Sequence, residues 1–334
     1  MDPLDVVALT RRLVDVESTT GDEAAVCVMV GEELERRGYA VTRQTVTGER
    51  VNLLATVGTP EVILSTHMDC VPPFTPSRVE GDRIHGRGSC DAKGILVSQV
   101  AASEAMRAAG ETRVGLLFLV GEERGSDGAM IADELSTGVT RFLVNGEPTE
   151  GRLALGHRGV VRVKLHAKGR AAHSGYPQLG ESAIEKLLDV LHDLRGGDWP
   201  ADEVLGRTHY TVGLISGGVA PNVIPPQAEA EVFFRTVGAH DALRRTLAAV
   251  VAGRVEVHEI LELPEVRLHT VPGFATEVFA YFSDVPFLTN WGTPLLLGPG
   301  TIHVAHTDRE QIAIADLERA VDLYADLASR LLRS

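Results

Sequence analysis

The segment 113–120, RVGLLFLV, places the strongest constraint on how this chain can fold. An apolar run of this length is typical of a β-strand that is buried on both faces, as strands are in a parallel sheet. Two more segments are expected to be buried strands, 61–66 and 140–145. Apolar residues at helical spacing lie before and between these strands, at 5–17, 23–37 and 92–109. This alternation predicts an α/β fold with a mostly parallel sheet flanked by helices.

The sequence pattern changes after about residue 156. Apolar and polar residues alternate in 160–169, as in a strand with one buried face. The elements expected next are a helix, two strands, a helix and a strand, at 182–194, 208–216, 227–236, 241–252 and 254–263. This β-α-β-β-α-β order predicts an inserted α+β, ferredoxin-like domain, 157–270. The first domain is then discontinuous, 1–156 and 271–334, and we expect its last part to be helical.

Charge and composition exclude several classes of protein. The chain has 334 residues and 44% hydrophobic content, which is enough to form two hydrophobic cores. Its formal net charge is −14, and it has no basic stripe that could bind the phosphates of nucleic acid. No apolar run approaches the roughly 18 residues that span a membrane. The N-terminal residues Met1–Asp5 lack the basic and apolar parts of a secretion signal. We therefore expect a cytoplasmic protein that binds neither nucleic acid nor membrane.

Residues of the kinds that bind metals follow several of the expected strands. They are His67 and Asp69 after 61–66, Asp91 after the segment RIHGRGSC, Glu122 and Glu123 after 113–120, and Glu147 after 140–145. Each residue alone is also compatible with an ordinary polar strand end. Together they favour a metal site, because adjacent carboxylates are costly to hold close unless a cation or a proton offsets their repulsion. Ligands of open α/β sheets bind beyond the carboxyl ends of the strands.

Seven motifs carry a resemblance to a known family. In chain order they are STHMDCVP, GRGSCDAKG, VGEERGSDG, VNGEPTEG, GRAAHSGYP, PNVIPPQAEAEVFFR and GPGTIHVAHTDRE. They resemble the motifs of the acetylornithine deacetylase / succinyl-diaminopimelate desuccinylase family, which are co-catalytic zinc amidohydrolases related to aminoacylases and glutamate carboxypeptidases. The resemblance implies a metal-binding catalytic domain with an inserted dimerisation or lid domain, and therefore a homodimer.

The resemblance also implies a set of metal ligands. Asp91 would bridge two zinc ions, with His67 and Glu147 completing one site, and Glu123 and His306 the other. Imidazole and carboxylate are suitable zinc ligands, and cobalt or manganese can substitute. Two such ions could share a hydroxide and polarise the scissile carbonyl.

Two choices in this set depend on local sequence. His303 and His306 lie in one loop, and His306 is preferred because the family's ligand histidine is followed four residues later by a glutamate, here Glu310. Glu122 is expected to be the general base, since its neighbour Glu123 is the expected ligand; a surface pair with Arg124 is the alternative. Asp69 is expected to orient the imidazole two residues before it.

Further residues are implied for the substrate. His173 resembles the family histidine that reaches the partner subunit's active site and stabilises the oxyanion. Asn222 and Arg235 match substrate-binding positions, with Arg235 holding a carboxylate. Gly292 and Thr293 are expected to contribute backbone contacts. The region TNWGTPLLLG lacks an acid that several family members carry after a Gly-Gly-Thr stretch.

The expected function is hydrolysis of an N-acyl amino acid, with acetylornithine as the leading substrate. The alternatives are a dipeptidase, a desuccinylase, a hydrolase that releases lysine or ornithine from an acidic carrier protein, and a binding protein without turnover. A single-metal or magnesium enzyme is a further alternative, although two histidines among the ligands favour zinc.

Overall fold

The computed structural model describes residues 4–334. The residues Met1–Pro3, part of the segment used for the secretion-signal prediction, lie outside it. The chain divides into two compact units. Unit 1 comprises residues 4–155, 268–279 and 283–334, and unit 2 comprises 156–267 and 280–282. Within 4–334 no helix has both the length and the apolar character needed to cross a membrane.

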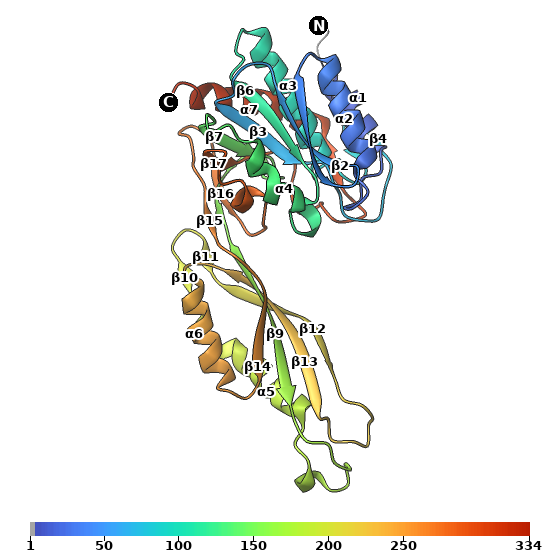
Figure 1. The fold of residues 1–334 in the computed structure, drawn as a ribbon, viewed down its shortest axis with the longest axis vertical. Coiled ribbons are helices and arrows are strands. Elements are labelled where there is room, and N and C mark those ends of the chain that lie inside the picture. The colour runs from blue at the N-terminus through green and yellow to red at the C-terminus, as the bar shows by residue number, and fades with distance from the viewer. Residues whose placement is uncertain (1–3) are drawn as a thin grey trace. The chain divides into compact units, whose positions relative to one another are not determined.

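The centre of unit 1 is a six-stranded sheet in the order β1-β2-β6-β3-β7-β17 (Figure 1). Its strands are β1 (Ala40–Thr47), β2 (Arg50–Thr56), β3 (Val62–His67), β6 (Val114–Leu119), β7 (Phe142–Asn145) and β17 (Thr293–Leu296). Strand β3 pairs in parallel with β6 and β7, and β17 pairs in parallel with β7. Only β1 and β2 run antiparallel. The predicted mostly parallel sheet is confirmed, and four strands end at the same edge.

Helices cover both faces of this sheet. They are α1 (Val6–Val14), α2 (Ala24–Arg36), α3 (Lys93–Ala108), α4 (Asp127–Ala132) and α7 (Ile314–Leu331). Leu64 and Leu116 belong to a core cluster with α1, α2, α3 and α7, whereas Ile63 and Leu117 pack with α4. Alternate side chains of one strand thus enter two different cores, which is why β6 and the first half of β3 are apolar at consecutive positions.

The expectation of a helical C-terminal part is only partly right. Before α7 the chain forms the strands β16 (Thr276–Phe279), β17 and β18 (Gln311–Ala313), and the 3-10 turn η5 (Val285–Phe287). The apolar residues 294–297 lie between Gly292 and Pro299, and they complete the parallel sheet beside β7. A short apolar run has no periodicity that separates strand from helix, so pairing with β7 decides its conformation.

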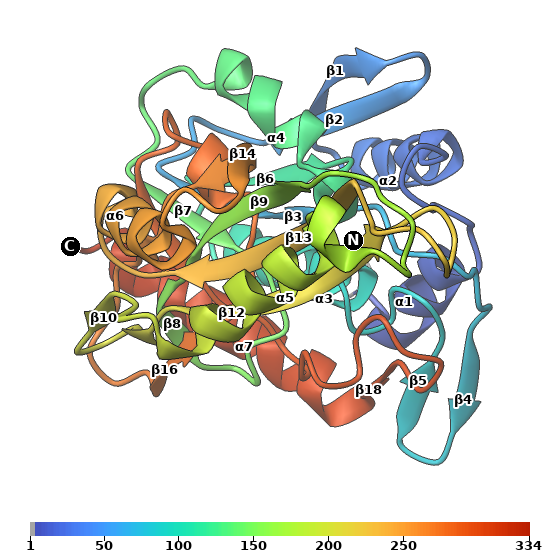
Figure 2. The ribbon, with the colours of Figure 1, turned by 90° about the horizontal axis from the view of Figure 1, so that it is seen from below.

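A small sheet brings the segment before α7 to the loop that precedes α3. Its strands are β4 (Arg78–Glu80), β5 (Arg83–His85) and β18, and Figure 2 shows β18 beside the β4–β5 hairpin. Ile312 of β18 pairs with Ile84 of β5, and the Gly86 N–H donates to the Glu310 carbonyl at 3.2 Å. This pairing places Glu310 next to residues 86–91.

Unit 2 is an antiparallel sheet in the order β12-β13-β9-β14 with two helices. The elements are β9 (Gly159–Lys168), α5 (Ala183–Asp193), β12 (His209–Gly217), β13 (Gln227–Thr236), α6 (His240–Val251) and β14 (Glu256–Leu263). Val163 and Leu165 of β9 are buried in a core with Leu187 and Leu247 of the helices. The intervening side chains, such as Lys164 and His166, therefore face away from that core. We call this second side the open face of the unit 2 sheet.

Short strands complete the two units. The chain passes from one unit to the other through β8 (Leu153–His157), β15 (Val266–Arg267) and β16. Within unit 2 a small hairpin is formed by β10 (Ala201–Asp202) and β11 (Gly206–Arg207).

His157 is a buried titratable group in unit 2. Its side chain is inaccessible to solvent, its ring lies edge-on to Phe282 with centroids 5.4 Å apart, and Nδ1 lies 3.3 Å from the Arg158 carbonyl. Burial lowers the pKa of His157 to about 4, against the small opposing effect of that carbonyl. The imidazole is therefore neutral in the folded protein at neutral pH.

We predict that His157 makes the fold sensitive to acid. Because its pKa is lower in the folded than in the unfolded protein, the unfolded chain binds the proton more readily. Protonation of His157 therefore does not reduce the free energy of unfolding above about pH 6.5. As the pH falls toward 4 it lowers the free energy of unfolding, by about 2–3 kcal/mol at pH 4.5. Urea unfolding at pH 7 and 4.5 should show a smaller acid-induced loss for His157→Gln than for the wild type. The exposed His192→Gln should match the wild type, and an equal loss in all three proteins would contradict the prediction.

Candidate metal centre

Four strand ends bring the candidate ligands of unit 1 to one edge of the sheet. His67 is the last residue of β3, Glu122 and Glu123 open the turn η1 (Glu122–Arg124) after β6, and Glu147 follows β7. His306 lies in the loop after β17. Because these four strands are parallel neighbours, the residues that follow them converge. Asp91 joins them from the loop that precedes α3.

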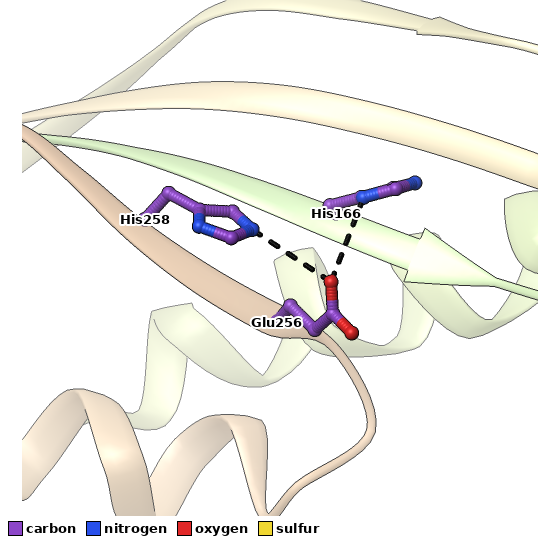
Figure 3. A group of neighbouring side chains, drawn as sticks. All are labelled: His166, Glu256 and His258. Carbon is purple, nitrogen blue, oxygen red and sulfur yellow. Dashed lines mark ion pairs between the residues drawn. The ribbon is translucent and has the colours of Figure 1, made fainter.

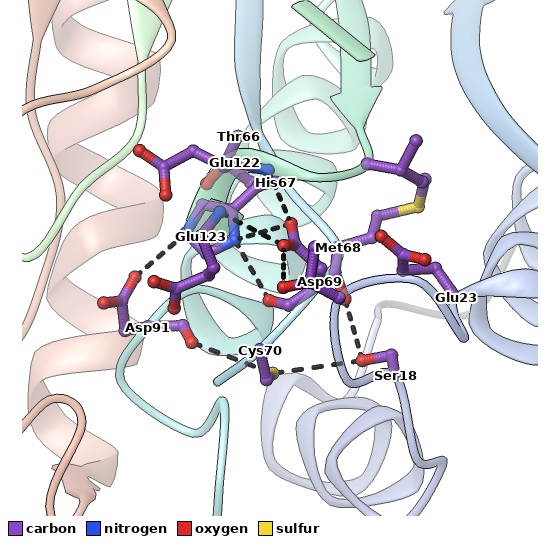
Figure 4. Close-up of polar contacts among 12 residues, drawn as sticks. Ser18, Glu23, Thr66, His67, Met68, Asp69, Cys70, Asp91, Glu122 and Glu123 are labelled. Carbon is purple, nitrogen blue, oxygen red and sulfur yellow. Dashed lines mark hydrogen bonds and ion pairs between the residues drawn. The ribbon is translucent and has the colours of Figure 1, made fainter. Parts of the chain in front are cut away.

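Asp91 lies between two imidazoles. The Asp91 Oδ1 atom is 3.0 Å from Nε2 of His67, and Oδ2 is 3.4 Å from Nε2 of His306. Glu123 Oε2 is 2.9 Å from the same His306 nitrogen. Figure 4 shows His67, Asp91 and Glu123 pointing toward one another, and one ligand atom from each lies within 4.8 Å of the others. Four of the five predicted ligands thus form one contact network.

Asp69 connects this network to the turn after β6. Its backbone carbonyl lies 3.0 Å from Nδ1 of His67, and its carboxylate Oδ1 lies 3.4 Å from the same nitrogen. The backbone N–H groups of Glu122 and Glu123 donate to the two Asp69 carboxylate oxygens at 3.1 and 3.2 Å. The Thr20 hydroxyl donates to Oδ2 at 2.8 Å. These contacts place Asp69 where it can orient the His67 ring, which stays a prediction. They also hold the Glu122–Glu123 turn, for which the sequence carries no local signal.

Glu310 holds the backbone of the Asp91 loop. Its Oε1 accepts hydrogen bonds from the N–H groups of Gly88, Cys90 and Asp91 at 2.8, 3.2 and 3.1 Å. Its Oε2 accepts from Nη1 of Arg87 at 2.6 Å. Both Glu310 and Arg87 are buried. In the sequence, Glu310 is notable only for its spacing of four residues from His306, which does not indicate this contact.

The cysteines near the cluster are packed thiols. Cys27, Cys70 and Cys90 are all free and buried. Burial raises the pKa of Cys70 to about 11, so this thiol is neutral at neutral pH. Gly88 has φ +87°, and a Cβ there would lie 2.6 Å from Cys70 Sγ, so glycine is required by both conformation and space.

The pKa values of the two histidines are displaced upward. Burial alone would lower the pKa of His67, but the Asp69 and Asp91 carboxylates outweigh burial and hold it well above its ordinary value. Asp91 and Glu123 raise the pKa of His306 to about 10. The surrounding carboxylates therefore attract positive charge strongly. Two imidazoles and three carboxylates form a donor set that fits a zinc-type cation, which can replace these protons.

Three more carboxyl groups in this region have raised pKa values. Burial raises the pKa of Glu122 and of Glu147 well above the ordinary value, and the charge of Asp284 raises both further. Burial also raises the pKa of Asp284 itself to about 7. Both Asp284 carboxylate oxygens are buried, and the Ser126 side chain opposes part of this increase. The only sequence signal for Asp284 is a single acidic residue within the largely apolar segment 282–288, which does not distinguish it from a surface acid. Glu147 is placed by burial and charge alone, since no hydrogen bond within 4–334 joins it to the other ligands.

The structure bears on two sequence alternatives. His303 is exposed and its ring makes no ion pair with these carboxylates, whereas His306 meets Asp91 and Glu123. His306 has φ +61°, an uncommon conformation for a residue other than glycine. Between residues 4 and 334 no ion pair joins Glu122 to Arg124. These observations support His306 as the ligand and leave the Glu122 carboxylate unpaired.

Gly292 and Thr293 are not brought to the metal centre. Thr293 pairs with Phe142, the first residue of β7, whereas the candidate ligands follow the opposite ends of these strands. Gly292 has φ +84° and lies against the Arg141 backbone. The expected substrate contacts of Gly292 and Thr293 are therefore not supported, because both lie at the amino-terminal edge of the parallel strands.

Unit 2 carries the other three predicted residues. His173 and Asn222 are both exposed and adjacent, since the Ser174 N–H donates to the Asn222 carbonyl at 3.0 Å. Arg235, on β13, stacks over the Phe233 ring at 5.0 Å, and its buried Nη1 has no hydrogen bond within residues 4–334. Burial, followed by the charge of Arg158, lowers the pKa of Arg235. Among residues 4–334, Arg235 thus has no anionic partner.

Comparison with known proteins identifies the family. The model of peptidase family M20/M25/M40 matches residues 63–330. A probable carboxypeptidase of Aspergillus fumigatus is 37% identical over 376 aligned positions, covering 96% of this chain and 86% of that protein. A tripeptidase from Staphylococcus aureus has a similar fold, with TM-score 0.82, 18% identity and coverage of 98% of this chain and 99% of that one. A Bacillus subtilis protein described as a dinuclear metal-binding M20 peptidase has TM-score 0.73, 17% identity and 98% coverage of both chains.

These findings confirm the predicted fold class and the prediction that the chain is a hydrolase of the metallopeptidase type. The narrower resemblance to the acetylornithine deacetylase branch stays a prediction. The family model spans most of the chain, and the Aspergillus relative is similar over nearly all of it. This chain therefore belongs to peptidase family M20/M25/M40.

Proposed function

We propose that the unit 1 cluster holds two zinc-type cations and hydrolyses the amide bond of an N-acyl amino acid. Asp91 would bridge the cations, with His67 and Glu147 on one and Glu123 and His306 on the other. The observation that carries this proposal is the position of Asp91, whose two carboxylate oxygens each face a different imidazole. The description of the Bacillus subtilis neighbour as dinuclear also supports it. When bound, such cations polarise a carbonyl and lower the pKa of water.

Glu122 is the proposed general base. Its backbone is fixed by the hydrogen bond to Asp69, and its carboxylate has no ion-pair partner within 4–334. Burial and neighbouring carboxylates raise its pKa, so it holds a proton more readily than an exposed glutamate does. A carboxylate so placed beside the ligand Glu123 can take the proton of the attacking water and deliver it to the leaving amine.

Cationic groups in unit 2 favour a substrate with a free carboxylate. Arg158 donates from Nη1 to Nδ1 of His209 at 2.7 Å, and His209 lies opposite Arg235 across β12 and β13. Burial and the two arginines lower the pKa of His209. No acidic residue within 4–334 pairs with Arg235, so a substrate carboxylate is its proposed partner, with Asn222 as a further contact.

Two acyl groups are candidates for the substrate. The sequence resemblance favours an acetyl group, with acetylornithine as the leading case. The Aspergillus relative is named a probable carboxypeptidase, which favours an aminoacyl or peptidyl group instead. Both substrates contain the same scissile amide and the same free carboxylate.

We also propose that the active form is a homodimer in which His173 serves the partner's site. His173 is exposed in its own unit, as an imidazole that acts elsewhere must be. Leu214, Ile215 and Val219, in or just after the edge strand β12, are exposed apolar residues that a second copy can cover.

Amine release from N-acetyl-ornithine, other N-acetyl and N-succinyl amino acids and dipeptides tests the reaction. With added zinc or cobalt we expect turnover that a chelator abolishes and that metal restores. Glu122→Gln should lower kcat by about 10²–10⁴-fold, because the base is lost, while the bound metal stays unchanged.

The substrate panel separates the candidates. Turnover of acetyl substrates alone supports a deacetylase, and turnover of dipeptides alone supports a peptidase. Two bound metals without turnover would direct the search to a carrier-protein substrate. Full activity of Glu122→Gln, or full activity after metal removal, would contradict the mechanism.

We predict that Glu310→Gln weakens metal binding by about 10–100-fold, because the Asp91 loop loses its charged acceptor. Arg87 then remains buried without its ion pair, so stability falls by about 3–5 kcal/mol. Zinc competition against a chromophoric chelator, corrected for the folded fraction, measures the affinity. Asp316→Asn removes a more exposed ion pair and is the matched control. Lower stability with unchanged zinc affinity would show that Glu310 is only structural.

Mixing two inactive variants tests the shared site. Glu122→Gln and His173→Ala should each be nearly inert as homodimers. Random exchange of subunits of a symmetric dimer gives mixed dimers with one intact site, and about a quarter of the wild-type activity should return. The absence of any recovery, with exchange verified by native mass spectrometry, would show that His173 does not act across subunits.

A further inference from the structure

A second group of metal-type ligands lies in unit 2. His166 is on β9, and Glu256 and His258 are on the neighbouring strand β14. Glu256 is directly opposite His166 in the register, and His258 follows two residues later. Because alternate residues of a strand share a face, all three side chains project from the open face of the unit 2 sheet (Figure 3).

The distances within this group suit a cation better than direct hydrogen bonds. Glu256 Oε2 lies 3.7 Å from Nδ1 of His166 and 3.7 Å from Nε2 of His258. One ligand atom from each residue lies within 4.8 Å of the others. Hydrogen bonds to oxygen need about 3.2 Å or less. Tetrahedral zinc with ligands at about 2.1 Å holds those ligand atoms about 3.4 Å apart.

Neighbouring charges leave one carboxylate oxygen available. Lys168 Nζ bonds to Oε1 of Glu256, so Oε2 is the oxygen that faces both imidazoles. Lys164, opposite His258, forms an ion pair with Glu229 at 3.6 Å. A carboxylate ligand whose second oxygen is held by a hydrogen bond is the usual arrangement at a metal.

We propose that His166, Glu256 and His258 bind one zinc-type divalent cation, independently of the unit 1 cluster. Two imidazole nitrogens and one carboxylate oxygen select zinc, nickel or copper over calcium and magnesium, which prefer oxygen ligands. The open face leaves a fourth position for water. The cation connects the edge strand β14 to β9 and holds the two strands together.

Zinc content of the full-length protein, dialysed against micromolar free Zn²⁺, tests this site. The wild type should bind one zinc per chain more than His258→Ala does. Glu256→Gln, which keeps the shape and removes the charge, should weaken the additional binding at least 10-fold. His192→Ala, an exposed histidine of α5 in the same unit, should match the wild type.

A further variant separates a metal site from a surface ion-pair cluster. Lys168→Met keeps all three ligands and removes the competing ammonium, so zinc should bind at least as tightly as it does to the wild type. Equal zinc content in the wild type and His258→Ala, or additional binding only at millimolar zinc, would overturn the proposal. Ions held by unit 1 contribute equally to all variants, so the difference is independent of the proposed hydrolysis.

Discussion

The arrangement of the metal centre depends first on the buried carboxylate of Asp69. It accepts hydrogen bonds from the Thr20 hydroxyl and from the backbone N–H groups of Glu122 and Glu123. Its own carbonyl faces His67. A buried carboxylate with three donors is stable as an anion. One side chain thus sets the ring orientation of a candidate ligand and the position of the proposed base.

Glu310 has the corresponding role on the other side of the cluster. It binds three backbone N–H groups of the Asp91 loop and the guanidinium of Arg87. Asp69 and Glu310 therefore fix their neighbours through backbone groups, so that Asp91, Glu122 and Glu123 keep their carboxylates for other contacts. The raised pKa of His306 reflects the negative charge of Asp91 and Glu123, whereas burial is the main cause of the raised pKa values of Glu122 and Glu147. Divalent cations are the chemical means by which such a site becomes stable and reactive at neutral pH.

In unit 2, one side of the sheet packs against the helices in a hydrophobic core, and the open face carries polar side chains. Arg158, His209 and Arg235 form a cationic group, and the Arg235 guanidinium has a buried nitrogen without a partner in residues 4–334. His166, Glu256 and His258 occupy the open face. His209 and Arg235, like the three residues of the second group, are strand residues, and the period of two along antiparallel strands places every second side chain opposite the helices. The same sheet can thus support recognition of a substrate carboxylate and a separate metal site.

The sequence by itself determined the α/β class and the mostly parallel sheet, because strands buried on both faces contain runs of consecutive apolar residues, such as 114–120. It also indicated which residues follow the strands, and His67, Asp91, Glu123 and His306 do meet in the structure. Tertiary structure alone decided that residues 293–296 form β17, since a short apolar run is compatible with strand or helix until it pairs with β7. That pairing places Gly292 and Thr293 at the edge away from the ligands. Only long-range contacts in the tertiary structure show that Asp284 influences Glu122 and that Glu310 binds the Asp91 loop. Neither Asp284 nor Glu310 lies in a segment whose sequence pattern predicts these contacts.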